Sequence, residues 1–360
     1  MRWSWRIATV SGIPVYVHGT FLALIAFFLV SDLTSGRTLW AALGTVIFIL
    51  AVFGAVVLHE FGHAFAARHY GIRTRDITLL PIGGLARLER IPEVPRQELW
   101  VALAGPAVNV VIVVVGVLAL VVLGLGVPAL SVEALAGSAV GRFLAVNLFL
   151  ALFNLIPAFP MDGGRALRAV LAERMDYLRA TEIAASLGQG LALLFGFLGL
   201  FTNPFLLFIA LFVWMGASAE TSVVSVRLAV AGLPVARAMI TDFRVVDAGD
   251  PLRHAADLVV AGTQQDFPVV EHGRLVGVLT RDALVRAIRD RGLDAPVGEV
   301  MVREFETVDV RDLLEQALTR LNASACPVLP VLDAGRVVGL LTSDNVGEFV
   351  MIRGAITSRR

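Results

Sequence analysis

The chain has 360 residues, of which 57% are hydrophobic and only 17% are charged. Soluble domains usually have about 45–50% apolar and about 25% charged residues, so this composition excludes an ordinary soluble protein. The formal net charge is zero, which gives no support for a nucleic-acid partner. The single cysteine, Cys326, excludes an intrachain disulfide framework and a cysteine-rich zinc site.

The apolar residues are concentrated before about residue 226, and charged residues return at ordinary density after it. A spanning helix needs about 20 mostly apolar residues. We therefore expect a multi-pass α-helical membrane domain over 1–226, followed by soluble α+β domains over 234–291 and 296–354. The six candidate transmembrane helices are 14–31, 39–67, 99–124, 141–158, 180–200 and 204–225.

Arginines are distributed unevenly between the loops of this domain. They precede the first candidate span and follow the second, fourth and sixth, whereas the other loops contain only Arg37. Because an excess of arginine marks the cytoplasmic side, we expect both termini to be cytoplasmic.

The second candidate span ends in His59-Glu60-Phe61-Gly62-His63. Residues four apart lie on one helix face, so His59 and His63 can offer two imidazoles to one metal ion. Zinc lowers the pKa of a bound water, and Glu60 can take its proton during attack on a carbonyl. Ionisable residues beside a membrane span are costly and indicate function. The pattern favours a hydrolytic zinc site over ordinary helix polar residues.

The segment 79–91 alternates in polarity and is too short to span a membrane. We expect it to form β-strands beside the zinc site, with an edge that can pair with an extended peptide. The alternative is a cytoplasmic hairpin without a role in substrate binding.

A catalytic zinc usually has a third protein ligand, and Asp162 is the best candidate. It follows the fourth span, so its predicted depth matches that of His63. Prolines and glycines on either side let the backbone turn closely around it. Two alternatives are that Asp162 only caps the next helix, or that His18 is the third ligand. His69 lies on the wrong helix face.

The soluble part contains an internal repeat. Residues 268–285 align with 330–347, and 234–239 with 296–301, both at an offset of 62 residues. Two copies of one unit can bury each other's apolar faces. Each copy is expected to contain an amphipathic helix, two short strands around a tight turn, and a second helix.

The joint order of "HEFGH", "AGPAVN" (104–109) and "NLIPAFPMDGG" (154–164) resembles the site-2 protease family of intramembrane zinc metalloproteases. The tandem repeat resembles a pair of CBS domains, as in one branch of that family. The resemblance implies one zinc ion per chain, with His59, His63 and Asp162 as ligands. It implies Glu60 as the catalytic acid/base, and a contact from Asn154 to the substrate or the oxyanion.

The same resemblance implies a cell-membrane metalloendopeptidase. Its substrates would be single-span membrane proteins, such as membrane-anchored regulators, cut within or near their transmembrane segments. CBS pairs resemble sensors of adenosine nucleotides, with ribose contacts in a Gly-x-x-Thr-x-x-Asp pattern. Thr280 and Thr342 fit that pattern, but Ala283 and Asn345 replace the final aspartate. Homodimerisation through the CBS pair, or a positional gate, is an equal alternative.

Other classes of protein fit the sequence less well. A membrane transporter or channel gated by CBS domains would leave the hydrolase motif unexplained, and we find no inverted repeat in the membrane half. An inactive scaffold would not need Glu60 together with all three candidate ligands. A soluble metallopeptidase tethered to the membrane would not place its motif within a span.

Overall fold

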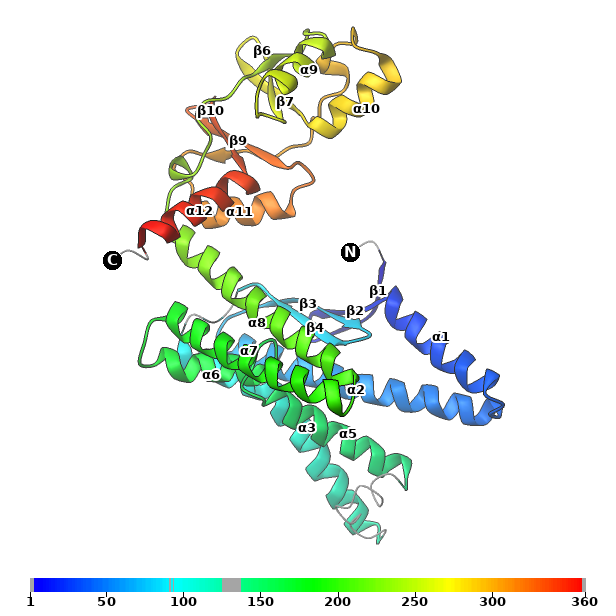
Figure 1. Ribbon diagram of the computed structural model, residues 1–360. Coiled ribbons are helices and arrows are strands. Elements are labelled where there is room, and N and C mark those ends of the chain that lie inside the picture. Colours follow the sequence, from blue (N-terminus) through cyan, green and yellow to red (C-terminus); the bar gives the residue numbers. More distant parts are fainter. Residues whose placement is uncertain (1–2, 91, 93, 125–136, 358–360) are drawn as a thin grey trace. The chain divides into compact units, whose positions relative to one another are not determined.

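The computed structural model describes residues 3–90, 92, 94–124 and 137–357 (Figure 1). Contacts divide the chain into two compact units, Met1–Ser222 and Val223–Arg360. The arginine pattern assigns the chain ends and the segment 125–136 to opposite sides of the membrane. These residues lie outside the part of the chain that the structure describes.

The first unit contains a four-stranded sheet in the order β1-β2-β3-β4. Strand β2 pairs antiparallel with β1 and parallel with β3, and β4 pairs antiparallel with β3. The strands expected in 79–91 are present as β4 and the end of β3, which begins earlier than predicted, at Thr74. They join an N-terminal hairpin that the sequence did not suggest. The strands are β1 (Ser4–Val10), β2 (Ile13–His18), β3 (Thr74–Leu80) and β4 (Gly83–Leu88).

The predicted first span, 14–31, is wrong at its start, because its first residues belong to strand β2. Alternate residues of this strand, Ile13, Val15 and Val17, are buried. The strand continues to His18, and helix α1 (Gly19–Thr34) begins only at the next residue. An apolar run can be strand or helix, and here it is one followed by the other.

The remaining helices of this unit correspond to the predicted apolar runs. Four are long and apolar enough to cross a membrane in the part of the chain described: α2 (Leu39–His69), α3 (Pro95–Val122), α7 (Tyr177–Phe201) and α8 (Phe205–Val230). Helices α1 and α5 (Ala139–Asn154) are apolar but shorter, with 16 residues each. The amphipathic helix α6 (Asp162–Ala172) follows α5 and is not one of the predicted apolar runs. Among the described residues, six apolar helices are present, and four of them reach spanning length.

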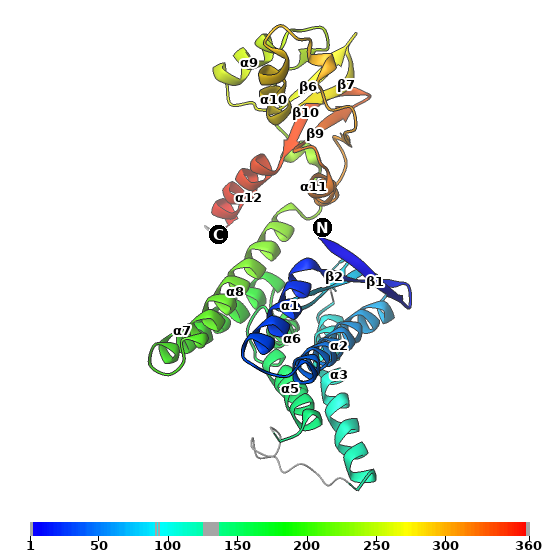
Figure 2. The ribbon, with the colours of Figure 1, turned by 90° about the vertical axis from the view of Figure 1, so that its right-hand side faces the viewer.

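Helix α2 packs against the sheet and against α3 (Figures 1 and 2). Phe61 and Ala64 of α2 share a buried cluster with Ile77 of β3. On the α3 side, a Cβ added at Gly62 would lie 2.6 Å from the carbonyl oxygen of Ala104. Small residues let membrane helices approach closely, and this approach sets the end of α2 beside α3.

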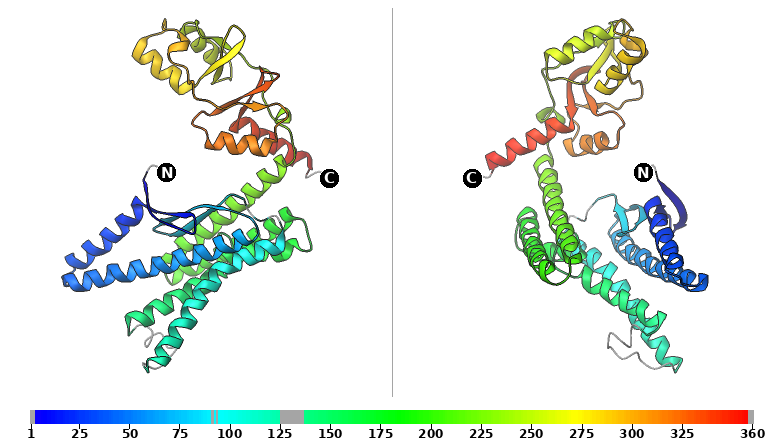
Figure 3. Two further views of the ribbon diagram at one scale, coloured as in Figure 1. Left: turned by 180° about the vertical axis from the view of Figure 1, so that it is seen from behind. Right: turned by 45° about the vertical axis from the view of Figure 1, so that its right-hand side comes forward.

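The second unit consists of two copies of one fold (Figure 3). Each copy has a three-stranded sheet, in the orders β5-β6-β7 and β10-β9-β8. The predicted tight turns are present, with positive φ at His272-Gly273 and at Ala334-Gly335. The first copy contains β5 (Val246–Asp247), α9 (Leu252–Ala261), β6 (Phe267–Glu271), β7 (Arg274–Leu279) and α10 (Arg281–Arg291). The second contains β8 (Val308–Asp309), α11 (Leu314–Ala323), β9 (Val328–Asp333), β10 (Arg336–Thr342) and α12 (Ser343–Thr357).

A hydrophobic cluster joins the two copies to each other. Val278 of β7 packs with Val328 and Leu340 of the second copy. Cys326 is part of this cluster, is buried, and has its thiol pKa raised by burial. The copies therefore share a core, as expected for a repeat whose units bury each other's apolar faces.

Candidate active site and metal centre

Three polar side chains converge in the first unit at the end of helix α2. The Nε2 atom of His59 lies 3.1 Å from Oδ2 of Asp162, and that of His63 lies 3.2 Å from the same oxygen. The two Nε2 atoms are 3.1 Å apart. All three residues are buried, and Asp162 is the first residue of α6. Helices α2 and α6 thus bring together the residues that the sequence suggested.

A chain of hydrogen bonds fixes which ring nitrogen of His59 carries the proton. The carbonyl of Phe143 can only accept, so Nδ2 of Asn147 donates to it, at 2.8 Å. Oδ1 of Asn147 then accepts from Nδ2 of Asn109, at 3.0 Å. Oδ1 of Asn109 therefore accepts from Nδ1 of His59, at 2.6 Å. The lone pair of neutral His59 is consequently on Nε2, facing Asp162.

His63 is oriented in the same way by a backbone carbonyl. Its Nδ1 lies 2.7 Å from the carbonyl oxygen of Val101, which can only accept, so Nδ1 carries the proton. Gly105 makes room for both rings, because a Cβ added there would lie 2.6 Å from Nε2 of His59 and would overlap the imidazole of His63.

This arrangement fits a zinc ion. Two imidazole lone pairs and a carboxylate oxygen at van der Waals distance repel one another unless a cation lies between them. Tetrahedral zinc with bonds of about 2.0–2.1 Å places its ligand atoms about 3.3 Å apart, close to the observed 3.1–3.2 Å. The donor set of two histidines and one carboxylate also occurs in catalytic zinc sites.

Glu60 lies between the ligand cluster and strand β4. Its Oε2 accepts a hydrogen bond of 3.0 Å from the backbone N–H of Ala86. A Cβ added at Gly84 would lie 2.6 Å from Cγ of Glu60, so the strand passes directly over this side chain. A carboxylate next to a metal site and half-buried against backbone can hold or release a proton there.

Asp162 does not act as the helix cap that the sequence left open as an alternative. The N-cap residue of α6 is Met161, and the carboxylate of Asp162 contacts two imidazoles instead. Gly164 allows the tight turn before α6, because a Cβ there would lie 2.6 Å from the carbonyl carbon of Ala158.

Four other candidate residues make local structural contacts. Nδ1 of His18 lies 2.8 Å from Oγ1 of Thr20 and caps helix α1, apart from the ligand cluster. Asn154 donates to the carbonyl of Leu150 within its own helix, at 2.9 Å. The hydroxyls of Thr280 and Thr342 accept from backbone N–H groups at the starts of α10 and α12, both at 3.2 Å.

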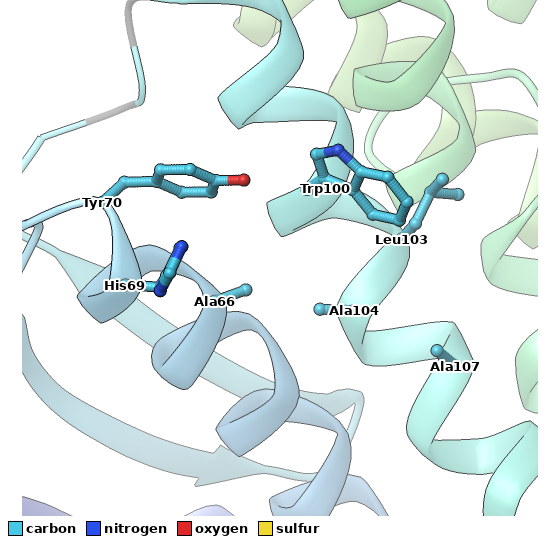
Figure 4. A pocket seen from close by; sticks show the side chains of 7 residues that line it. All are labelled: Ala66, His69, Tyr70, Trp100, Leu103, Ala104 and Ala107. Carbon is cyan, nitrogen blue, oxygen red and sulfur yellow. The ribbon is translucent and has the colours of Figure 1, made fainter.

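A separate apolar pocket of about 300 Å³ lies between α2 and α3 (Figure 4). His69, which the sequence placed on the wrong face for the metal, lines this pocket. The other lining residues are Ala66, Tyr70, Trp100, Leu103, Ala104 and Ala107.

The sequence interpretation missed the roles of Asn109 and Asn147. Both are fully buried in the helical domain and act on His59 through the chain described above. The available signal was an uncharged polar residue inside an apolar run, because such residues are costly in a membrane and indicate function.

Comparisons with known proteins show what each unit of the chain is similar to. Residues 47–141 and 129–195 match peptidase family M50, and residues 235–290 and 297–351 match the CBS domain. The zinc metalloprotease MJ0392 of Methanocaldococcus jannaschii is 33% identical over 353 residues, covering 96% of each chain. Stage IV sporulation protein FB of Bacillus subtilis is 27% identical over 157 residues, covering 43% of this chain and 51% of its own length. The solved structure of a site-2 protease from Methanocaldococcus jannaschii is 37% identical, with a TM-score of 0.45, covering 61% of this chain and 95% of that one.

An apolar helical domain with this donor set defines a membrane metalloprotease. The relationship to a full-length relative makes the assignment specific: the chain belongs to peptidase family M50, the site-2 proteases. It is a zinc metalloprotease with a C-terminal pair of CBS domains. The alternative of a CBS-gated transporter is not favoured.

Proposed function

We propose that this enzyme hydrolyses peptide bonds within or near transmembrane segments of other membrane proteins, as in regulated intramembrane proteolysis. The observation that carries the proposal is the position of Glu60, between a buried His-His-Asp cluster and the backbone of strand β4. A metal cluster at the end of an apolar helix suits a substrate that is itself embedded in the membrane.

His59, His63 and Asp162 are the proposed ligands of one zinc ion per chain. When bound, zinc would supply a Lewis acid that polarises the scissile carbonyl and lowers the pKa of water towards neutrality. Glu60 accepts the proton of the attacking water and passes it to the leaving amine. Asn109 and the carbonyl of Val101 hold the two imidazoles with Nε2 towards the cluster.

Strand β4 is the proposed docking edge for the substrate. It is the last strand of the sheet as described, and Ala86 directs its N–H at Glu60. A substrate helix has its carbonyls hydrogen-bonded internally, so it must unwind before attack. An extended segment that adds to β4 would present its backbone beside Glu60. Asn154, at the end of α5, is a proposed further contact to the substrate or the oxyanion.

The remaining parts of the proposal concern the setting of the enzyme. It lies in the cell membrane as a multi-pass protein with cytoplasmic termini, and water reaches the site from the cytoplasm. Its substrates are single-span proteins such as membrane-anchored regulators. The CBS pair regulates cleavage, and homodimerisation is the mode we favour. Asn345 replaces the expected aspartate and donates its side-chain amide to the carbonyl of Ala238, which argues against an adenosine nucleotide at that position.

The experiment that tests the mechanism is the substitution Glu60→Gln, assayed on candidate single-span substrates. General-base losses typically cost about a hundredfold or more, so cleavage should fall by that factor. Zinc content should not change, because Glu60 is not a proposed ligand. The control is Glu89→Gln, an exposed carboxylate next to β4. Cleavage at the wild-type rate by Glu60→Gln would contradict the mechanism, even with zinc present.

A second experiment tests the ligand set by metal analysis of the purified protein. The wild type should contain about one zinc ion per chain. His59→Ala, His63→Ala and Asp162→Ala should each lower this content, whereas His18→Ala should not. Full zinc content in Asp162→Ala, together with a lowered content in His18→Ala, would reassign the third ligand to His18.

A further inference from the structure

Arg168, in the middle of helix α6, is a fully buried charge. Burying a charge is strongly unfavourable unless it is paired and hydrogen-bonded. Its Nε donates to Oε1 of Glu98 on α3 at 2.9 Å, and one terminal nitrogen donates to the same oxygen. The other terminal nitrogen donates to Oε1 of Glu220 on α8, at 2.6 Å. One guanidinium therefore joins three helices.

Two aromatic rings complete the surroundings of this guanidinium. Its central carbon lies 5.0 Å from the ring centroid of Phe159 and 4.9 Å from that of Tyr177, the first residue of α7. The hydroxyl of Tyr177 also donates to Oε1 of Glu98, at 3.3 Å. Planar stacking and in-plane hydrogen bonding are thus used together, and among cationic side chains only arginine can do both.

We infer that Arg168 is a positioning residue for Asp162, the proposed zinc ligand. Arg168 fixes the chain before Asp162 by stacking on Phe159, which lies three residues before that ligand. It fixes the chain after Asp162 because Arg168 itself lies six residues later in the same helix, α6. Six residues of helix correspond to about 9 Å of rigid rod. A displacement of α6 at Arg168 therefore moves the carboxylate of Asp162 by a similar amount.

A metal site tolerates only small changes in its ligand distances, so the position of α6 matters for zinc binding. Metal–ligand distances hold to within about 0.2 Å, so a shift of α6 by even half an ångström weakens the bond from Asp162. His59 and His63 lie on α2 and do not move with α6. The main route from Arg168 to zinc is therefore through Asp162. Arg168 also bonds Glu98 on α3, the helix that carries Val101 and Asn109, and the double-mutant cycle below distinguishes the two routes. The inference rests on the proposed role of Asp162 as a ligand.

The test measures zinc affinity of the full-length protein in detergent, by competition with a chelator. Arg168→Lys keeps the charge but removes the planar fork, and we expect a 10- to 100-fold weaker zinc affinity, as for other residues that orient ligands. Arg165→Lys, an exposed arginine on the same helix, is the matched control and should have wild-type affinity. Glu220→Gln is a milder second variant, expected to weaken affinity less, should Arg168→Lys fail to fold.

A double-mutant cycle separates positioning from general destabilisation. In an Asp162→Ala background, Arg168→Lys should not weaken any further the residual zinc affinity from the two histidines. A weakening that persists in full in that background would overturn the inference, as would wild-type affinity in both Arg168→Lys and Glu220→Gln. The proposed function fails differently, through absence of zinc from the wild type or through full activity of Glu60→Gln.

Discussion

The chain of amides behind His59 acts on one atom, because it decides where the imidazole proton lies. Each amide has one orientation that satisfies the hydrogen bond of its neighbour. The chain of hydrogen bonds ends at the carbonyl of Phe143, which can only accept. If residue 109 could not accept a hydrogen bond, His59 would be free to rotate or to place its proton on Nε2. Either change removes the lone pair from the metal cluster.

This gives a prediction for Asn109→Leu, which keeps the volume but removes the acceptor. Zinc affinity should fall by about 10- to 100-fold, the usual cost of removing an outer-shell partner. Asn147→Leu should have a smaller effect, because it acts through Asn109. Chelator competition measures both. Asn154→Leu is the control and should leave zinc affinity unchanged, since Asn154 bonds within its own helix. Wild-type affinity in Asn109→Leu would show that the chain of amides is dispensable.

The convergence of the three candidate ligands could be predicted from the sequence. The hydrogen bonds that orient these ligands could not. His59 and His63 are four apart on a helix, and the arginine pattern put Asp162 at their depth. The amide chain instead joins residues 50 and 38 positions apart, through hydrogen bonds that exist only after α2, α3 and α5 have packed. Arg168 is similar, because its partner Glu98 is 70 positions away.

At the level of the elements, the main error was the start of the first predicted span. A period of two over Ile13, Val15 and Val17 was hidden in an apolar run that continues into helix α1. Strand β2 is stabilised by parallel pairing with β3, about sixty residues later, and local propensity cannot show such a partner. The strands of the two copies in the second unit were easier to predict, because the tight turn between them is determined by neighbouring residues.

The hydrogen bond from Ala86 of strand β4 to Glu60 allows a prediction that separates catalysis from metal binding. Proline is tolerated on an edge strand where the N–H faces outward, and Ala86 directs its N–H at Glu60. Ala86→Pro should therefore keep the fold and the zinc content. It should slow cleavage by at least about fivefold, equivalent to one hydrogen bond of about 1 kcal/mol.

Ala86→Val is the matched control, because it enlarges the side chain and keeps the N–H. Cleavage rates and zinc content of the two variants should be measured side by side. Equal cleavage by Ala86→Pro and the wild type would show that the hydrogen bond from Ala86 to Glu60 is dispensable for catalysis.

For the whole molecule, the arginine distribution predicts the orientation in the membrane. Reporters fused after residue 360 or placed near Arg90 should be cytoplasmic, and one in the segment 125–138 should be external. The reason is that translocation of short arginine-rich loops is disfavoured. An inverted pattern in these fusions would place the metal cluster near the external surface and refute the proposed water path.

Cys326 is the only thiol in the chain, and its burial in the core shared by the two CBS copies makes it a natural probe of their separation. Alkylation requires a thiolate that the reagent can reach, so modification waits for the copies to open, and its rate reports the open fraction. Anything that binds only the closed pair slows modification in proportion to its saturation. We expect millimolar AMP to leave the rate unchanged, and dimerisation to slow it as protein concentration rises. A slowing by AMP would mean that the pair binds nucleotide despite Ala283 and Asn345. The unmodified protein thus carries its own label for identifying what regulates it.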